Sequence, residues 1–299
     1  MVPHGLTCAS FLARRGAIVT IYEKYSKLGG ILRYGIPEFR LSKDILDSTI
    51  KKILELGISV KYNIEIGKDI SLEELTSIYD AVFIGIGANI PWKMGIQGED
   101  LQGVYGGNTL LEKQNHPDYT GKRVCIIGGG NVAMDCARTI KRLGAESVCV
   151  IYRRSEKQMP AERKEIEDAK LEGVEFLFQN NVTKILGQDK VDKIECIKTE
   201  LVKKEGESRE VPIDVEGSNY IIPMDYVVMA IGSAPEEGIL RKFDLERTKK
   251  GYIKVDEEYR TSNEKVFAGG DIIGQKATVA YASRAGRDAA ESIIKYLKK

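Results

Sequence analysis

Cysteine is scarce in this sequence, and its five cysteines are not arranged in pairs. No CxxC or CxxxxC pattern occurs in the 299 residues. Metal clusters and redox-active dithiols need such spacing, so the sequence predicts neither a metal site nor a thiol redox centre. We expect the scattered cysteines to be buried free thiols.

A charge excess of one sign and long apolar runs are also missing. The 45 Lys+Arg and 44 Asp+Glu residues leave a net charge of +1, which gives no general electrostatic case for a nucleic-acid partner. No apolar run approaches the roughly 18 residues of a membrane span, and the start at Met1 lacks the features of a signal peptide. These absences predict a cytoplasmic protein of one or two domains, with no membrane and no nucleic-acid partner.

What the sequence does contain is glycine placed directly after short β-branched runs. In the first part of the chain, a run at residues 17–22 ends at Glu23 and is followed by a glycine-rich loop at residues 28–41. Ser42 is a candidate N-cap for the next helix. Strands and helices then alternate to about residue 86, which is typical of βαβ units.

A second βαβ pattern starts with a strand at residues 124–127, three glycines, a helix and a strand at residues 147–152. The polar stretch 203–217 predicts a hairpin tip. The pattern changes again near Phe243, and the last expected elements are a strand at 252–255, a strand at 266–268 and a helix at 278–297. One block is therefore predicted to be inserted into another, in an α/β fold of two Rossmann-like nucleotide-binding domains.

The three glycines carry a complete dinucleotide-binding fingerprint. Gly128, Gly130 and Ala133 fit GxGxxA between a strand and a helix, which is the context the motif requires. The first glycine allows the tight turn, the second lets a pyrophosphate approach the backbone, and the small alanine permits close packing. The free N–H groups of the helix then hold the phosphates. A glycine turn without a ligand is the simpler alternative.

The end of the following strand indicates which nicotinamide nucleotide is preferred. An NAD site has an acidic residue there to accept from the ribose hydroxyls. This chain has Arg153 and Arg154 instead, and guanidinium groups pair well with a 2′-phosphate. The sequence therefore favours NADP(H), the alternative being two solvated arginines at a surface.

A second fingerprint is incomplete at the start of the sequence. If Gly5 is its third glycine, the first would lie at position zero, so the first strand and the first glycines are absent. Glu23 lies where an acid takes the ribose hydroxyls of an adenosine half. Asp271, after two glycines, suits an acid near a ribityl chain, and the helix that begins at 277–279 can stabilise negative charge on a reduced flavin. The simpler readings are an exposed acid at Glu23 and an ordinary turn at Asp271.

The motifs, taken in order, resemble those of one family of redox proteins. They are GLTCA, IYEK, LGGILRYGIPEFRL, FIGIGA, VCIIGGGNVAMDCART, IYRRSEKQMPA, VVMAIG and VFAGGD. The chain resembles, over nearly its whole length, the small (beta) subunit of NADPH-dependent glutamate synthase. Relatives of that subunit include the larger subunit of NADH-dependent ferredoxin:NADP oxidoreductase and the flavin half of dihydropyrimidine dehydrogenase.

The resemblance implies a disulfide-reductase-like plan of two domains. An FAD-binding domain would comprise residues 1–118 and 243–299, with its first strand missing, and an NADPH-binding domain would comprise residues 119–242. Around FAD it implies Gly5, Glu23, Gly30, Ile31, Arg40, Asp271, Ala277, Thr278 and Val279. Around NADPH it implies Gly128, Gly129, Gly130, Asn131, Val132, Arg153, Arg154, Ala230, Ile231 and Gly232.

The same resemblance implies the chemistry. Such proteins pass a hydride from NADPH to FAD and then electrons to iron–sulfur clusters, while the protein supplies orientation and electrostatics. No catalytic acid or base is therefore assigned. The implied partner is a glutamate synthase large-subunit-like protein or another electron-accepting protein.

The sequence departs from this family at its start. It lacks both the cysteine-rich module that holds the family's [4Fe–4S] clusters and the first strand of the FAD fold, so the chain is expected to be N-terminally truncated. The alternative function is a non-catalytic NADP(H)-binding fragment or subunit that has lost FAD binding. A thioredoxin-reductase-like disulfide reductase is disfavoured because no cysteine pair could receive the electrons. A short-chain dehydrogenase is disfavoured because no YxxxK motif stands at a suitable site.

Overall fold

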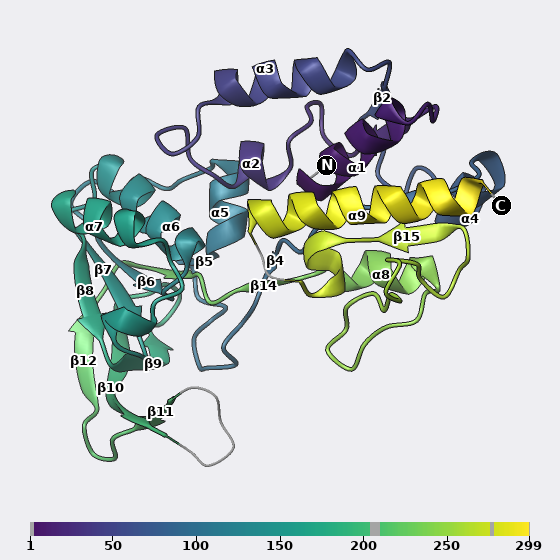
Figure 1. Ribbon diagram of the computed structural model, residues 1–299. Helices are drawn as coiled ribbons and strands as arrows, with labels where there is room; N and C mark the ends of the chain where they lie inside the picture. The colour runs from purple at the N-terminus through teal and green to yellow at the C-terminus, as the bar shows by residue number, and fades with distance from the viewer. Residues whose placement is uncertain (1–2, 204–209, 276–277, 299) are drawn as a thin grey trace. The chain divides into compact units, whose positions relative to one another are not determined.

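The computed structural model describes residues 3–203, 210–275 and 278–298. The chain forms two compact units (Figure 1). Unit 1 comprises Met1–Ile90 and Ala234–Lys299, and unit 2 comprises Pro91–Ser233. The two short strands β4 (Ile90–Pro91) and β14 (Ser233–Ala234), where the chain passes from one unit to the other, pair with each other.

These boundaries differ from the expected ones at 118/119 and 242/243. Strand β5 (Val104–Gly106) pairs with a strand of unit 2, and helix α5 (Gly107–Lys113) contributes buried leucines to the core of that unit. Helix α8 (Glu237–Phe243) contributes Leu240 and Phe243 to a core of unit 1. Both boundaries are therefore set by tertiary packing, which the local sequence pattern does not reveal.

Unit 2 is built on a five-stranded parallel sheet in the order β5-β13-β6-β7-β8. Its other strands are β6 (Arg123–Ile127), β7 (Ser147–Tyr152), β8 (Glu175–Phe178) and β13 (Tyr226–Met229). Both faces are covered, which explains why the central strands are almost continuously apolar. All their carboxyl ends meet at one edge, where α/β sheets bind ligands.

Alternate residues of these strands enter two different cores. Val124, Ile126 and Val150 pack under the helices α6 (Asn131–Arg142) and α7 (Arg163–Leu171). The intervening residues, including Cys125 and Cys149, face a second, antiparallel sheet. The period of two in a strand therefore gives unit 2 three layers, with the parallel sheet in the middle.

The antiparallel sheet lies between β8 and β13 in the sequence. Its strands are β9 (Asn180–Leu186), β10 (Lys193–Val202), β11 (Val211–Asp214) and β12 (Tyr220–Pro223). Strand β10 pairs antiparallel with β11, and Val202 lies opposite Val211. Strand β11 therefore lies inside the stretch 203–217 that was predicted to be a hairpin tip. Residues 204–209 lie outside the described part.

Unit 1 contains two pairs of parallel strands and two long helices in contact. The strand pairs are β1 (Thr20–Glu23) with β2 (Ser59–Tyr62) and β3 (Val82–Ile84) with β15 (Val266–Ala268). Helix α1 (Pro3–Arg14) packs against α9 (Val279–Leu297), and Figure 1 shows α9 running beside β15. A Cβ at Gly286 would lie 2.1 Å from the carbonyl oxygen of His4, so glycine is what lets the two helices approach this closely.

The remaining elements of unit 1 connect these strands. They are α2 (Ile31–Tyr34), α3 (Lys43–Leu54), α4 (Leu72–Ile78) and the 3₁₀ turn η2 (Gly270–Ile273). Ser42 caps α3 as predicted, since its side chain accepts from the Asp44 N–H. The strand expected at 252–255 is not formed: Ile253 makes only an isolated bridge with Arg247 and donates its N–H to the Ile272 carbonyl.

Candidate functional site

The glycines at the end of β6 differ in what surrounds them. A Cβ at Gly128 would lie 2.3 Å from the Ala230 carbonyl oxygen, and one at Gly129 would lie 2.6 Å from the Tyr152 ring. Gly128 also has a φ of +140°, a backbone conformation that residues with a Cβ rarely adopt. These two glycines are therefore explained by the close packing of the loop against the ends of β13 and β7.

Gly130 is different, because a Cβ there would meet no heavy atom within 4 Å. It is the N-cap of α6, and no side chain caps that helix end. The first N–H groups of a helix have no partners within the helix and carry partial positive charge. Open space over a bare backbone at this position suits the approach of a phosphate.

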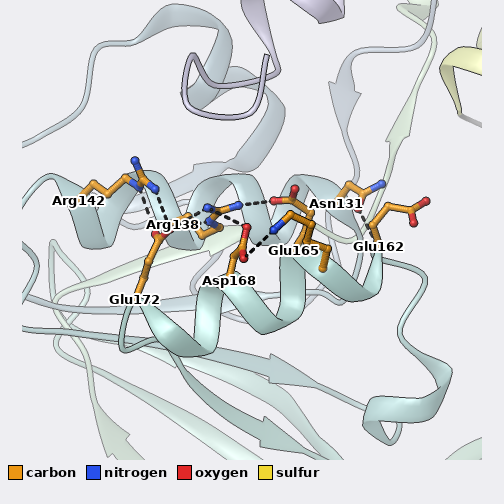
Figure 2. Close-up of polar contacts among 8 residues, drawn as sticks. Asn131, Arg138, Arg142, Glu162, Glu165, Asp168 and Glu172 are labelled. Atoms are coloured by element: carbon orange, nitrogen blue, oxygen red, sulfur yellow. Dashed lines mark hydrogen bonds and ion pairs between the residues drawn. The ribbon is translucent and has the colours of Figure 1, made fainter. Parts of the chain in front are cut away.

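Asn131, expected beside NADPH, uses its side chain within the protein. Its Oδ1 accepts the Glu162 N–H at 2.9 Å, and Gly129 accepts the Ala161 N–H at 3.1 Å. Figure 2 shows Asn131 reaching toward Glu162 at the start of α7. Val132 contributes to the helix-side core of unit 2. We infer that these two residues contribute backbone N–H groups rather than side chains to the glycine loop.

A buried ion network that the sequence did not indicate joins α6 to α7 (Figure 2). The Arg138 side chain is only 6% exposed and lies 2.5 Å from Glu165, 2.7 Å from Glu172 and 3.4 Å from Asp168. Arg142 also pairs with Glu172, and its hydrogen bond is the main cause that lowers the pKa of that carboxyl. The arginines are four residues apart, which was the only signal available. The network holds the helix whose N-terminus forms the glycine loop.

Arg153 and Arg154 follow β7 directly. The backbone of both arginines is fixed by hydrogen bonds. The Arg153 carbonyl accepts from the Thr199 hydroxyl at 2.8 Å, and the Arg154 carbonyl accepts from the Gln179 N–H. The Arg154 Nε is buried and has no hydrogen-bond partner among residues 3–203, 210–275 and 278–298. A buried donor without a partner costs free energy. The residue as a whole is only partly buried, so its charge remains available to an anionic ligand.

Ala230, Ile231 and Gly232 continue from β13 at the same edge. The Ala230 N–H donates to the Ile127 carbonyl at 2.8 Å, and the Gly232 carbonyl accepts the Trp92 N–H at 3.1 Å. The strand order therefore brings together the residues that the sequence assigned to NADPH, at the ends of β13, β6 and β7.

In unit 1, Gly5 lies inside α1, next to a fully buried histidine. The Gly5 Cα would lie 3.3 Å from a Cβ at Gly85. The ring of His4 packs against Gly270, whose Cβ would lie 2.3 Å from Nδ1. His4 is 1% exposed, both its ring nitrogens lack hydrogen-bond partners within the described structure, and burial lowers its pKa to about 3. The imidazole therefore fills the space beside Gly270 in its neutral form.

Two carboxylates of unit 1 stand at strand ends, as their sequence positions suggested. Glu23 ends β1, is 3% exposed, and its Oε1 accepts the Tyr25 N–H at 3.1 Å. Asp271 follows β15 within η2, and burial raises its pKa. Thr278 caps α9 by accepting the Tyr281 N–H, and Val279 is half exposed in the first turn. Ala277 lies outside the described residues.

The glycine-rich loop that holds Gly30, Ile31 and Arg40 is fixed by two basic residues. The Arg33 side chain is buried, donates to the Leu28 carbonyl at 2.6 Å and pairs with Asp47. Lys43 donates to three carbonyl oxygens of the loop, at distances of 2.6 to 3.2 Å. Gly30 has φ +49° and precedes α2. Sequence reasoning did not assign a role to Arg33, although it lies in the motif LGGILRYGIPEFRL, or to Lys43, which follows that motif.

The five cysteines are free and buried, as predicted. Burial raises the pKa of Cys149 and Cys196 to about 12, so these thiols stay protonated and unreactive. No group of three potential metal-ligating side chains occurs in the described ranges. Within the same ranges, every helix is too short or too polar to cross a membrane.

Comparisons with known proteins agree with this architecture. The family model for pyridine nucleotide-disulphide oxidoreductases matches residues 3–287. The glutamate synthase [NADPH] small chains of Halomonas elongata and Escherichia coli align with 99% of this chain, at sequence identities of 39% and 37%. This chain spans about two thirds of each, 66% and 67%.

Solved structures show the same fold at lower identity. Mycobacterium tuberculosis FprA in complex with NADPH superposes with a TM-score of 0.85 at 21% identity, over 99% of this chain and 83% of FprA. The thioredoxin reductase of T. acidophilum gives a TM-score of 0.72 at 22% identity, over 99% and 96% of the two chains. From the family match and the small-chain relatives, the chain belongs to the pyridine nucleotide-disulphide oxidoreductase family, in the group of the glutamate synthase small chains.

Proposed function

We propose that this chain is the part of a glutamate synthase small-chain type oxidoreductase that oxidises NADPH and reduces a bound FAD. Unit 2 binds NADP(H) at the carboxyl edge of its parallel sheet, and unit 1 binds FAD. Electrons then pass to a partner protein or an iron–sulfur module. The relatives whose names include NADPH support this reading.

The observation that carries the proposal is the cationic, open end of the unit 2 sheet. Gly130 offers bare backbone at the start of α6, and Arg154 offers a buried donor that has no partner in the described residues. Adjacent strand ends lie about 5 Å apart, so a pyrophosphate on the glycine loop leaves the adenosine 2′-phosphate within reach of the end of β7. The arginines therefore select NADP(H) over NAD(H) through charged hydrogen bonds.

The residues of unit 1 that would hold FAD also fit that group. Glu23 presents a buried carboxylate at the end of β1 to accept from ribose hydroxyls, and Asp271 presents a partly buried carboxylate after β15. Gly30 and Ile31 lie in the loop that Lys43 braces. A flavin, when bound, supplies the ability to take an electron pair from reduced nicotinamide and to release single electrons.

The chain's own residues then orient the cofactors and exclude water, and they transfer no protons. The first turn of α9, capped by Thr278, provides positive helix charge that favours an anionic flavin ring. The neutral imidazole of His4 excludes water from the space beside Gly270.

The electron acceptor is proposed to be a protein that holds iron–sulfur clusters or a glutamate synthase large subunit. The described residues hold no cluster of metal-ligating side chains, and the five buried thiols cannot form a dithiol with an accessible surface. We therefore expect the electrons to leave to another module or protein.

A second function, NADP(H) binding without flavin chemistry, is favoured by His4 alone. Its ring occupies the volume beside Gly270 and Gly85, where a smaller side chain would leave room for a ligand at the end of β15. In this case unit 2 keeps its NADP(H) site, and in unit 1 the His4 ring fills the space that a ligand would need.

One experiment separates the two functions. The full chain is purified, its flavin content is measured after denaturation, and reduction of an acceptor dye is followed with NADPH and with NADH. The proposed function predicts stoichiometric FAD and dye reduction that is faster with NADPH. Protein that binds NADPH but holds no FAD, even after incubation with it, and reduces no dye would establish the second function instead.

A further inference from the structure

The single tryptophan of the chain lies at the edge of unit 2 that carries the glycine loop. Trp92 follows β4, and the residue is 47% exposed. Its backbone N–H donates to the Gly232 carbonyl at 3.1 Å. A Cβ at Gly232 would lie only 3.0 Å from the indole ring, so the absence of a side chain there allows the ring to lie on the backbone that leaves β13.

The segment that carries Trp92 is fixed on its other side too. Pro91 packs on Gly106, where a Cβ would lie 2.5 Å from the proline ring. Gly106 ends β5, the strand next to β13 in the sheet. A large aromatic side chain is therefore held at a defined position while half of its surface stays in water. Such a surface costs hydrophobic free energy unless something covers it.

The strand order places this ring at one end of a row of candidate ligand groups. Arg154 follows β7, Gly130 follows β6, and Gly232 with Trp92 follows β13. These strands are consecutive neighbours in the sheet. An extended dinucleotide with its 2′-phosphate on Arg154 and its pyrophosphate on the glycine loop continues in the direction of β13. Its nicotinamide half therefore reaches the Trp92 end of the row.

We propose that the indole of Trp92 is a positioning residue that contacts the nicotinamide half of NADP(H). The inference rests on the proposed NADP(H) site and adds the residue that holds the reactive end of the cofactor. A flat aromatic surface suits a nicotinamide ring, because the contact removes apolar surface of both from water. The adenosine half makes no contact with Trp92.

The test uses the fluorescence of Trp92, which is the only indole in the chain. The full chain is titrated with NADP⁺, which does not absorb indole emission, so quenching requires contact rather than energy transfer. Adenosine 2′,5′-bisphosphate, which has the adenosine half alone, is the matched control, and binding of both is measured by calorimetry. We expect NADP⁺ to quench the emission and the control to bind without quenching. Binding of NADP⁺ with unchanged emission would overturn the proposal.

Two variants separate a contact from a structural role. Trp92→Ala should raise the Kd for NADP⁺ about tenfold, the loss expected for one aromatic stacking contact, and leave the Kd for the bisphosphate unchanged. Trp92→Phe should keep most of the affinity. Equal losses for both ligands would assign Trp92 a role in folding only. If neither ligand binds to the unaltered chain, the NADP(H) site itself fails, and this inference fails with it.

Discussion

Replacing Arg154 with alanine tests the assignment of the end of β7 to the 2′-phosphate. The guanidinium carries a buried Nε with no hydrogen-bond partner in the described residues, so a bound phosphate would supply a charged acceptor. A hydrogen bond to a charged group contributes about 1.5–3 kcal/mol. We expect Arg154→Ala to weaken NADPH binding about 10- to 150-fold, since 1.4 kcal/mol corresponds to a factor of ten.

The same structure predicts what Arg154→Ala does to stability. Truncation removes a buried donor that makes no hydrogen bond, so the free energy of unfolding should stay the same or rise slightly. The exposed neighbour offers a matched control: Arg153→Ala should weaken NADPH binding less, because solvent screens its charge. Arg154→Lys should recover only part of the affinity, because an ammonium lacks the planar fork.

The assay is isothermal calorimetry of each variant with NADPH and with NADH, beside urea unfolding. A contact between Arg154 and the 2′-phosphate predicts weaker binding of NADPH and unchanged binding of NADH, which lacks the phosphate. Equal losses for the two nucleotides would refute the role of Arg154. A large drop in the free energy of unfolding would instead assign the arginine to the fold.

Three further predictions follow from the packing. Gly128→Ala should unfold the chain at lower temperature, because its Cβ would meet the Ala230 carbonyl at 2.3 Å with φ at +140°, whereas Gly130→Ala should fold normally and lose NADP(H) affinity. Arg138→Ala should lower the free energy of unfolding by about 3 kcal/mol, as expected for a buried pair that loses one partner, and the more exposed Arg142 should matter by less than about 1 kcal/mol. The pKa of His4 falls from 6.5 to about 3 in the folded chain, so protons bind the unfolded state preferentially and stability should fall by up to about 5 kcal/mol as the pH drops from 6.5 toward 3. The His4→Gln variant should lack this part of the pH dependence and keep the part that comes from carboxyls with a lowered pKa, such as Asp47 and Glu172.

Thermal melts check the glycine variants, and urea unfolding checks the arginine variants. Urea midpoints measured over a pH series check the prediction for His4. Equal melting temperatures for the two glycine variants would contradict the packing difference. Equal losses for the two arginine variants would show that burial of the network does not matter. An unchanged acid slope in His4→Gln would remove His4 as its cause.

The α/β fold and the glycine loop could be predicted because they are written in local patterns. β-branched runs mark buried parallel strands, and Gly128 and Gly130 stand directly between such a run and a helix. Ser42 could be identified as an N-cap because capping depends only on the residues of one turn.

Other features depend on contacts between distant residues. The pairing of Arg138 with Glu165, Asp168 and Glu172 arises only when α6 and α7 lie side by side. The role of Asn131 depends in the same way on the start of α7. Neither partner choice follows from local spacing, so sequence reasoning could predict neither the network nor the hydrogen bond between Asn131 and Glu162.

The two unit boundaries show the same limit. A βαβ pattern that restarts at residues 119–122 suggested a boundary near residue 118, but β5 joins the unit 2 sheet through backbone hydrogen bonds with β13. Likewise, the run at 252–255 has strand-forming residues, yet its backbone hydrogen bonds go to Ile272 of η2 and to Glu246 and Thr248 rather than to a sheet. Tertiary pairing therefore overrides the local propensity.

The most direct test of the account is an anaerobic NADPH titration of the purified full chain, followed by visible absorbance. If the chain binds FAD and reduces it with NADPH, the spectrum shows the band of oxidised flavin. One equivalent of NADPH then bleaches that band, and the same amount of NADH bleaches it much less. A flavin band that NADPH leaves unchanged, or protein that stays colourless after incubation with FAD, would contradict it.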